Sequence, residues 1–346
     1  MIDVKRVLYK GVYKIGEYID KKNDCTDYES EQGRCFLVGG IEHGNYGDHA
    51  INVAEYDWFE RRNISFIEIP ETRITTFINN LRNNVHPDDE FYFHGGGNMG
   101  DVWPDQEVWR QNLIETFPDN KIVIFPQSVN YDQDSDLLRK TVSITKKAKN
   151  LTIFLRDKHS YDFVKEVFPE TVSVKLVPDM VLSSTGMNRN IRNTDVCLLM
   201  RSDKELVRDK IKSNFIDFLK NNQTLNVDVS DTCTDYMPYI TRKNRRSFLE
   251  SKLRKIGNSK VVVTDRLHGM IFSLITSTPV IVFDNNTHKI RDLILTWLRD
   301  FQSIYFVQPG TTMDELTSEL EKLMSNNFDK VYTDDEKFKR LLDDAI

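Results

Sequence analysis

The sequence of 346 residues is poor in cysteine and has no long apolar run. Its four cysteines, Cys25, Cys35, Cys197 and Cys233, are scattered and form no CxxC pair, which argues against a zinc site and predicts reduced thiols. No apolar run approaches the roughly 20 residues that a membrane span needs. Residues 1–24 contain no apolar core of the kind found in a signal peptide. We therefore expect a cytoplasmic protein, either free or lying against the inner face of the membrane.

An excess of positive charge is also absent, because the formal net charge is -6. A mildly acidic chain gives no reason to expect nucleic-acid binding. Seven basic residues nevertheless gather in one stretch, which is typical of a solvated helix face. A contact with an anionic membrane or a lipid-diphosphate substrate is the alternative. The stretch comprises Arg242, Lys243, Arg245, Arg246, Lys252, Arg254 and Lys255.

Short runs of β-branched and aromatic residues recur along the chain, each followed by a longer helical pattern. This alternation predicts βαβ units and a parallel sheet. The length suggests two domains, at roughly 100–200 residues per domain. The fold class we predict is therefore α/β, with two Rossmann-like domains. The candidate strands are 35–40, 64–69, 90–96, 121–126, 151–156 and 173–178, then 195–201, 224–230, 260–265, 279–284 and 303–308.

The domain limits follow from breaks in this alternation. The polar stretch 183–194 has no periodicity and is interpreted as a linker. It separates an N-terminal domain over 35–185 from a C-terminal domain over 195–330. Residues 1–34 have no assigned role, and the charged tail 331–346 is either a helix packed back across the first domain or a frayed end.

Open α/β domains bind ligands outside the carboxyl ends of their strands, so residues directly after strands are the informative ones. The first such segment, 39–48, carries four glycines and precedes a helix. Glycines let backbone N–H groups approach a ligand, and a helix N-terminus favours anions. The spacing is not GxGxxG, so a dinucleotide is not implied. A tight turn with Asp48 as the helix N-cap is the alternative.

The second segment is His94–Asp101, with three consecutive glycines at the end of a strand. Glycine contributes no side chain to packing and loses entropy on folding, so a ligand close to the backbone is the simpler explanation. His94 either touches that ligand or is held by a backbone carbonyl. Two further strand ends carry Gln127, which could bind a sugar hydroxyl, and Arg201. An arginine after so apolar a strand either faces a cleft or pairs with Asp203 or Glu205.

The fourth segment, Thr264–Gly269, places Arg266 and His268 two residues apart at a strand-to-helix turn. Arginine offers a planar fork that binds carboxylate or phosphate, and histidine can deliver a proton near neutral pH. Asp265 is close enough to orient either one. The pattern predicts an anion site beside a general acid. Further along, Lys289 either adds a second cation or is a surface lysine.

These segments together resemble the polysaccharide pyruvyltransferase family, in order and in spacing, over roughly residues 35–300. The matching motifs are GGIEHGNYGD, FHGGGNMGDVWP, IVIFPQSV, the LRD of 155–157, LVPDM and VVTDRLHGMIFSLI. The resemblance is strongest to members that belong to bacterial exopolysaccharide production. It implies two Rossmann-like domains arranged as in GT-B glycosyltransferases, with a cleft between them.

The resemblance implies transfer of pyruvate from phosphoenolpyruvate to two hydroxyls of a sugar, giving a cyclic ketal and phosphate. It links Arg266 and His268 to the donor and to catalysis, with Arg201 as a third donor residue by position. We accordingly expect His268 as the acid, Asp265 as its orienting partner, and Lys289 beside the donor. No cofactor and no metal are expected, and the acceptor could be lipid-linked. The expected acceptor contacts are Asn45, Asp48, His94, Gly96, Gly97, Asn98, Asp101 and Gln127.

Two other functions fit the same scaffold. A nucleotide-sugar glycosyltransferase would use an acidic residue to hold a ribose, for which Asp284 and Asp292 are candidates. A sugar-binding protein without catalysis is the other. The intact cluster of Asp265, Arg266 and His268 argues against it.

Overall fold

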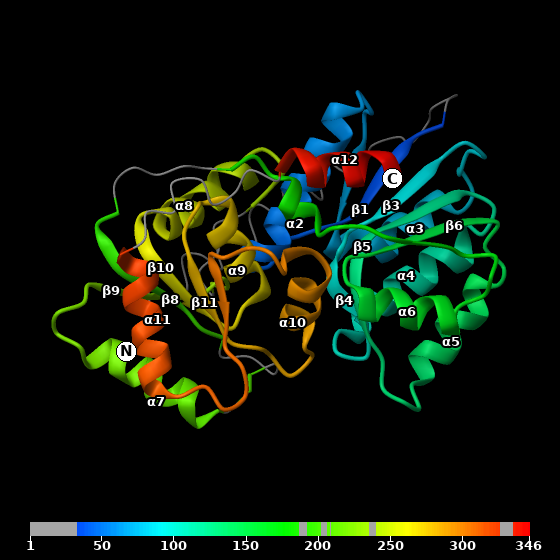
Figure 1. The fold of residues 1–346 in the computed structure, drawn as a ribbon. Helices are drawn as coiled ribbons and strands as arrows, with labels where there is room; N and C mark the ends of the chain where they lie inside the picture. The colour runs from blue at the N-terminus through cyan, green and yellow to red at the C-terminus, as the bar shows by residue number, and fades with distance from the viewer. Residues whose placement is uncertain (1–32, 187–191, 202–205, 208, 235–239, 326–334) are drawn as a thin grey trace, which may run out of the picture. The chain divides into compact units, whose positions relative to one another are not determined.

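The computed structural model describes residues 33–186, 192–201, 206–207, 209–234, 240–325 and 335–346. These fall into two compact units, each built on its own parallel sheet (Figure 1). Unit 1 comprises the chain up to Val177 together with Cys233–Phe248, and unit 2 comprises Pro178–Thr232 and Leu249–Ile346. Two Rossmann-like α/β domains are therefore confirmed.

The sheet of unit 1 has the strand order β2-β1-β3-β5-β6-β7, with β4 paired to the end of β5. All these pairs are parallel. Its strands are β1 (Cys35–Gly40), β2 (Ile67–Pro70), β3 (Glu90–Phe93), β4 (Gly96–Gly100), β5 (Lys121–Asn130), β6 (Asn150–Leu155) and β7 (Ser173–Leu176). Its helices are α2 (Tyr46–Arg61), α3 (Ile74–Leu81), α4 (Pro104–Thr116), α5 (Asp136–Thr145) and α6 (Lys158–Val167).

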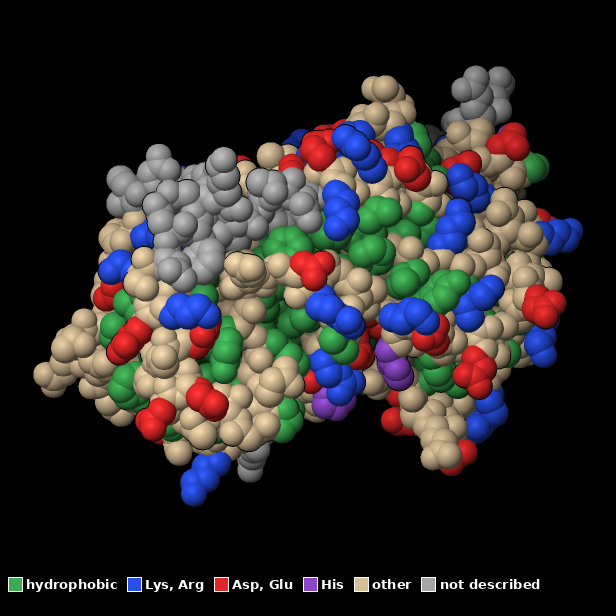
Figure 2. Space-filling view, in the orientation of Figure 1, with side chains coloured by type: hydrophobic (Ala, Val, Ile, Leu, Met, Phe, Trp, Pro, Cys, Tyr) green, Lys and Arg blue, Asp and Glu red, His purple; other side chains and the backbone are tan. Residues whose placement is uncertain are grey.

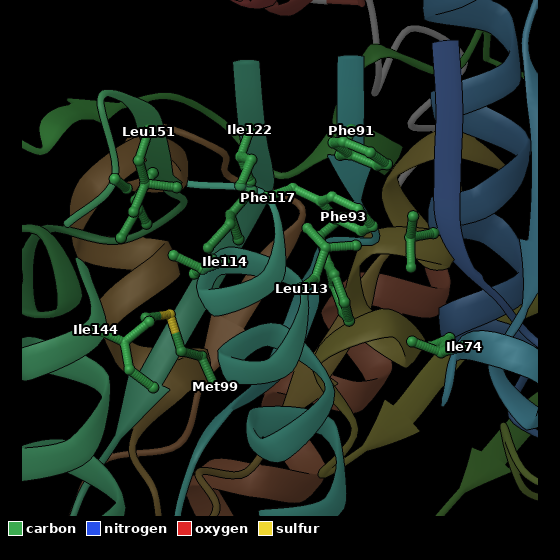
Figure 3. Packing of buried hydrophobic residues seen from close by; sticks show 14 of the residues in the cluster. Ile74, Phe91, Phe93, Met99, Leu113, Ile114, Phe117, Ile122, Ile144 and Leu151 are labelled. Atoms are coloured by element: carbon green, nitrogen blue, oxygen red, sulfur yellow. The ribbon is translucent and has the colours of Figure 1, made fainter. Parts of the chain in front are cut away.

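Strand alternation divides the core of unit 1 into two layers, because successive side chains point to opposite faces of a sheet. One face carries Phe91 and Phe93 of β3, which pack with buried residues of α3, α4 and α5 (Figure 3). The opposite face carries Tyr92 of β3 and Phe125 of β5, whose rings meet Trp58 of α2. Both faces are thus buried, as a doubly covered parallel sheet requires.

The sheet of unit 2 has the order β12-β11-β10-β8-β9, again all parallel. Its buried face packs on Phe215 of α7 and on Leu316 and Leu320 of α11. Its strands are β8 (Thr194–Leu199), β9 (Val227–Ser230), β10 (Ser259–Thr264), β11 (Val280–Val282) and β12 (Ile304–Phe306). Its helices are α7 (Lys210–Asn221), α9 (Leu267–Ile275), α10 (Lys289–Leu293), α11 (Met313–Ser325) and α12 (Asp335–Ala345).

The units differ from the predicted domains in two places. The boundary after β7 falls between Val177 and Pro178, earlier than the predicted linker 183–194. The segment Cys233–Phe248, which includes the start of α8 (Arg245–Gly257), belongs to unit 1. The charged tail contains α12, which contacts the short helix η2 (Met180–Ser183) of unit 2 and buries Phe338 and Leu342. Residues 1–32 lie outside the described residues.

The glycine-rich stretch after β3 differs in structure from what the sequence predicted. It was expected to be a ligand loop, but Gly96–Gly100 forms β4 against β5. Close packing against β5 explains why two residues of this stretch are glycine. A Cβ on Gly95 would lie 2.9 Å from the carbonyl oxygen of Pro126, and one on Gly100 would lie 2.0 Å from that of Asn130. The close approach at these two glycines is therefore made by the neighbouring strand.

Gly100 gives a stability prediction with a matched control. It has a φ of +126°, and Gly310 has a φ of +91° with nothing within 4 Å of an added Cβ. Both alanine variants carry backbone strain of about 1–3 kcal/mol. We expect Gly100→Ala to lose about 1–3 kcal/mol more in urea unfolding, because of the clash with Asn130. Equal losses in the two variants would contradict the assigned contact.

Candidate functional site

The carboxyl ends of three neighbouring strands of unit 2 carry charged residues, one of which is the predicted donor residue Arg201. Arg201 follows β8, Asp231 follows β9, and Asp265 follows β10. Their alignment follows from the parallel register, in which Leu199 is paired with both Thr264 and Ser230. The Thr264 hydroxyl fixes the turn, because it donates to the carbonyl of Leu199 (2.7 Å) and accepts from the N–H of Arg266 (3.0 Å).

The glycine of the DRLHG motif has a local explanation. A Cβ on Gly269 would lie 2.4 Å from Oγ1 of Thr264. Only glycine lets the first turn of α9 pass this hydroxyl, so Gly269 sets how closely α9 approaches β10. The Arg266 backbone precedes that helix in an extended conformation and serves as its N-cap residue. Arg266 and His268 thereby begin α9 at the end of a buried strand.

Arg266 holds a carboxylate in the forked geometry that arginine favours. Its Nε donates to Oδ1 of Asp231 at 2.9 Å, and its Nη2 donates to Oδ2 at 2.7 Å. Arg266 is 7% exposed. The β9 end is itself anchored, because Nζ of Lys252 donates to the carbonyl of Asp231 and to Oγ of Ser230, both at 2.8 Å. Asp231 therefore fixes the plane of the guanidinium through two of its five N–H groups.

Asp265 is fully buried and connects the end of β10 to the end of β8 and to α7. Its Oδ1 accepts the backbone N–H of Arg201 at 2.8 Å, and its Oδ2 accepts Nζ of Lys212 at 3.1 Å. The prediction that Asp265 orients the Arg266 or His268 side chain is corrected, because its carboxylate is engaged with Arg201 and Lys212. The residues 203 and 205 considered as partners for Arg201 lie outside the described residues.

The buried pair of Asp265 and Lys212 gives a second stability prediction. Asp265→Asn keeps the shape but leaves Lys212, whose side chain is 5% exposed, without its counter-charge. Breaking a buried ion pair from one side costs about 3–5 kcal/mol, so we expect a loss of that order in urea unfolding. The double variant with Lys212→Met should recover part of the loss. If Asp265→Asn is as stable as the wild type, the ion pair does not contribute to the free energy of unfolding.

His268 lies beside a carboxylate that was not among the predicted site residues. Its Nε2 is 3.6 Å from Oδ2 of Asp179, whose other oxygen accepts the N–H of Val181 at 2.9 Å and caps η2. Asp179 is buried, and the His268 side chain is 12% exposed. At 3.6 Å the two groups attract electrostatically without forming a hydrogen bond. Asp179 is therefore placed to position the imidazole of His268 through its charge.

The end of β11 carries Lys289, which begins α10 and is half-buried. The preceding residue, His288, is in the left-handed conformation and contacts Asp284 through its Nδ1 at 2.7 Å. Asp292 pairs with Arg291 at 3.3 Å. Both acids proposed as ribose ligands are thus engaged with side chains of their own segment.

In unit 1, Asn45 and Asp48 lie together at the start of α2. Asn45 is the N-cap, accepting the N–H of Gly47 at 2.9 Å, so the alternative with Asp48 as N-cap is wrong. Asn45 Nδ2 also donates to Oδ2 of Asp48 at 2.7 Å. The Asp48 side chain is 21% exposed, and its Oδ2 lies 3.5 Å from Nε2 of His43.

His94 is buried in a polar network instead of facing solvent. Its Nδ1 lies 3.0 Å from Oε2 of Glu55 and 2.8 Å from Nδ2 of Asn52, and Glu55 also accepts the N–H of Gly95. Burial lowers the pKa of His94, but the Glu55 carboxylate more than offsets it, and the net pKa is raised. The partner of Nδ1 is a carboxylate, so the alternative of a backbone carbonyl is wrong.

The other predicted acceptor residues are also engaged within unit 1. Gln127 is fully buried and donates to the carbonyl of His94. Asn98 accepts from Arg110 at 2.8 Å, and Asp101 accepts from the N–H of Asp132 and from Oγ of Ser135. The bonds of Asn98 and Asp101 connect β4 and the residue after it to α4 and to the loop between β5 and α5. His94 and Gln127 are buried, and their contact with a sugar stays a prediction.

Two glycines of the predicted acceptor set lie in β4. Gly96 has a φ of +126°, which side-chain-bearing residues rarely adopt, and Gly97 is half-buried. A Cβ on Gly96 would lie 3.5 Å from Ile51 and 4.0 Å from Oδ1 of Asp48. The backbone conformation, more than the space around it, therefore requires glycine here.

The basic stretch is a solvated face only in part, because two of its members are buried. Arg245 is buried, pairs with Glu68 and donates to the carbonyl of Ile41 at 2.8 Å. Lys252 is buried and binds the β9 end, as described above. Four of the other members, Arg242, Arg246, Arg254 and Lys255, have acidic or aromatic neighbours in their own units. On the face shown in Figure 2, basic and acidic side chains lie interspersed.

Four side chains that position the site residues were missed: Glu55, Asp179, Asp231 and Lys212. Only Asp179 carried a sequence signal, as part of the LVPDM motif after β7. In the part of the chain that the structure describes, no group of three or more His, Cys, Asp or Glu side chains is placed to hold a metal ion. No helix among these residues is long and apolar enough to cross a bilayer.

Comparison with known proteins places the chain in a family. The model of the family described as "Polysaccharide pyruvyl transferase" matches residues 45–287. The chain belongs to this family. It is 33% identical over 303 residues to "General stress protein 30" of Bacillus subtilis, covering 85% of this chain and 86% of the relative.

Two further similarities extend this result. The chain is 32% identical over 279 residues to "Pyruvyl transferase 1" of Schizosaccharomyces pombe, covering 76% of this chain and 69% of that protein. The crystal structure of KP1_0663 from Klebsiella pneumoniae matches with a TM-score of 0.53 at 19% identity, covering 86% of this chain and 98% of that one. At this identity the structural match supports the fold alone.

Proposed function

We propose that this family member transfers pyruvate from phosphoenolpyruvate to two hydroxyls of a sugar, forming a cyclic ketal in the synthesis of a cell-surface polysaccharide. The observation that carries the proposal is the pairing of Arg266 and His268 at the start of α9. Arg266 presents a guanidinium already oriented by Asp231, and His268 lies beside the buried Asp179. An oriented arginine next to a proton donor suits an anionic substrate that must be protonated.

The donor carries a carboxylate and a phosphate, so it needs more than one cation. Arg266 is proposed to bind one of these groups. Arg201 and Lys289 follow β8 and β11, the two strands that flank β10, and are proposed to bind the other group. Arginine suits this role because its planar fork matches both anions. Donor binding then requires Arg266 either to release Asp231 or to bind the donor through its remaining N–H groups while it still holds Asp231.

The proposed chemistry begins with protonation of the donor. The methylene carbon takes a proton from His268 as the electron pair of the carbon–carbon double bond moves to it. A sugar hydroxyl oxygen bonds to the neighbouring carbon and loses its proton to solvent. The bond from that carbon to the phosphate oxygen then breaks, and phosphate leaves with the electron pair. The second hydroxyl bonds to the same carbon and closes the ketal, releasing its proton.

The proposal is tested by incubating the full chain with phosphoenolpyruvate and a panel of free and lipid-linked glycosides. We expect phosphate release that depends on the glycoside, together with a product carrying the mass of a pyruvate ketal. Thermal-shift measurements with phosphoenolpyruvate and with nucleotide sugars provide the comparison. Stabilisation by nucleotide sugars alone, with no phosphate release, would favour the glycosyltransferase and overturn the proposal.

A further inference from the structure

One buried lysine of unit 2 bonds to the end of β9 and has no part in the proposed chemistry. Lys252 lies on α8, in the part of that helix that belongs to unit 2, and is 8% exposed. Lysine is almost never buried unless its ammonium group is paired. Lys255, almost one turn further along the same helix, has a side chain that is 55% exposed. The burial of Lys252 therefore needs an explanation that Lys255 does not.

The Lys252 ammonium group holds the end of β9. Its Nζ donates to Oγ of Ser230 and to the carbonyl oxygen of Asp231, both at 2.8 Å. The Asp231 carboxylate is fixed in turn by the N–H of Thr232, which donates to Oδ1 at 2.6 Å. Both oxygens of this carboxylate accept from Arg266, at 2.9 and 2.7 Å. Hydrogen bonds no longer than 2.9 Å thus connect Lys252 to Asp231 and Asp231 to Arg266.

A second buried lysine of unit 2 is arranged in a similar way beside Arg201. Lys212 of α7 donates through Nζ to Oδ2 of Asp265 at 3.1 Å. The other oxygen of Asp265 accepts the backbone N–H of Arg201 at 2.8 Å. Each of the two arginines proposed for the donor is therefore held by an aspartate that is itself bonded to a buried lysine. The repetition indicates that the lysines serve the strand ends and not only local packing.

Lys252 also changes the net charge beside Arg266. An arginine bonded to a carboxylate carries little net charge, so Arg266 and Asp231 alone would attract an anion weakly. Burial lowers the pKa of Lys252, and the carboxylates of Asp231 and Asp228 oppose this effect. Its two oxygen acceptors also favour the charged ammonium form. Lys252, Asp231 and Arg266 together therefore carry a net positive charge, which suits a donor with a phosphate and a carboxylate.

We infer that Lys252 is a positioning residue of the donor site, which fixes Asp231 and through it the guanidinium plane of Arg266, and which keeps this part of the site positive. The inference rests on the proposed function for the identity of the donor as phosphoenolpyruvate. Because Lys252 acts through Asp231, its removal is expected to change the affinity for the donor more than the chemical step.

The test compares Lys252→Met with Lys255→Met in the full chain. Both substitutions remove an ammonium group of α8 that bonds to β9, since Lys255 pairs with Asp228 at 3.0 Å. We expect Lys252→Met to raise the Kd and the KM for phosphoenolpyruvate about tenfold or more, while kcat and the KM for the glycoside stay within about threefold. Lys255→Met should leave all four values unchanged. Lys252→Arg keeps the charge and should recover part of the affinity.

A milder variant keeps the inference testable if Lys252→Met does not fold. Ser230→Ala removes one of the two acceptors of the Lys252 ammonium group and changes no charge. We expect it to weaken phosphoenolpyruvate binding about twofold to fivefold. Titration calorimetry measures the affinities, and circular dichroism confirms that each variant is folded.

The outcomes separate this inference from the proposed function. An unchanged Kd for phosphoenolpyruvate in folded Lys252→Met, or an equal loss in Lys255→Met, would overturn the positioning role, and pyruvate transfer by the wild type would still stand. Titration with inorganic phosphate covers the opposite case. If the wild type binds phosphate, Lys252→Met binds it about tenfold more weakly, and neither consumes phosphoenolpyruvate, the proposed function fails and the positioning of Arg266 for an anion stands.

Discussion

Replacing Arg266 by alanine is expected to abolish detectable binding of phosphoenolpyruvate and to lower kcat/KM by about 10²–10⁴. The magnitude follows from the loss of two charge-assisted hydrogen bonds of about 1.5–3 kcal/mol each. Arg266→Lys should recover little, because an ammonium keeps the charge but cannot reproduce the fork. Isothermal titration with phosphoenolpyruvate and initial rates of phosphate release measure the two effects.

The control for this variant addresses Asp231, which loses its partner when Arg266 is removed. The Asp231 side chain is 22% exposed, so part of the resulting cost is relieved by water. We expect the double variant Arg266→Ala/Asp231→Asn to recover most of the lost melting temperature while staying inactive. Wild-type affinity for phosphoenolpyruvate in the folded single variant would remove Arg266 from the donor site.

Much of the fold could be predicted because both sheets are parallel and buried on both faces. Such strands are nearly continuous apolar runs, and β1 and β10 occupy almost the predicted ranges. The glycine-rich β4 was missed because glycine has no strand signal and its pairing with β5 is a long-range contact. The assignment of Cys233–Phe248 to unit 1 was missed for the same reason, since it depends on tertiary contacts and not on a local pattern.

The candidate site was predictable only for residues that directly follow strands. Arg201 and Arg266 were found because an arginine after an apolar strand is unusual. Asp231 was not, although it holds Arg266, because an aspartate in a polar turn is ordinary. Glu55 was missed because it lies in the middle of a helix and does not follow a strand. A side chain's partner depends on which strands become neighbours, and the sequence alone does not reveal that order.

Burial separates ligand-facing from structural residues in a way that residue type does not. His94 and His43 are both histidines in glycine-rich motifs of the first domain. His94 is 1% exposed and paired with Glu55, whereas the His43 side chain is 45% exposed. Sequence reasoning selected His94 because it directly follows a strand. The sequence does not distinguish the two, because burial depends on tertiary contacts.

His268→Ala is expected to lower kcat by about 10²–10⁴ while leaving the affinity for phosphoenolpyruvate within a few-fold of the wild type. This is the usual contribution of a general acid, and in the proposed mechanism the donor is held by arginine instead of by the imidazole. Single-turnover phosphate release reports the chemical step, and titration reports binding. Added imidazole should restore part of the turnover, because it can occupy the space of the removed ring and supply the proton.

Asp179→Asn distinguishes a proton donor positioned by a carboxylate from one that acts alone. The amide keeps the shape beside His268 but removes the negative charge 3.6 Å from its Nε2. We expect a smaller fall in kcat than in His268→Ala, because the imidazole stays in place and loses only its electrostatic partner. His159→Ala, an exposed histidine of α6, serves as the control. Full activity in His268→Ala without imidazole would assign the proton to another group.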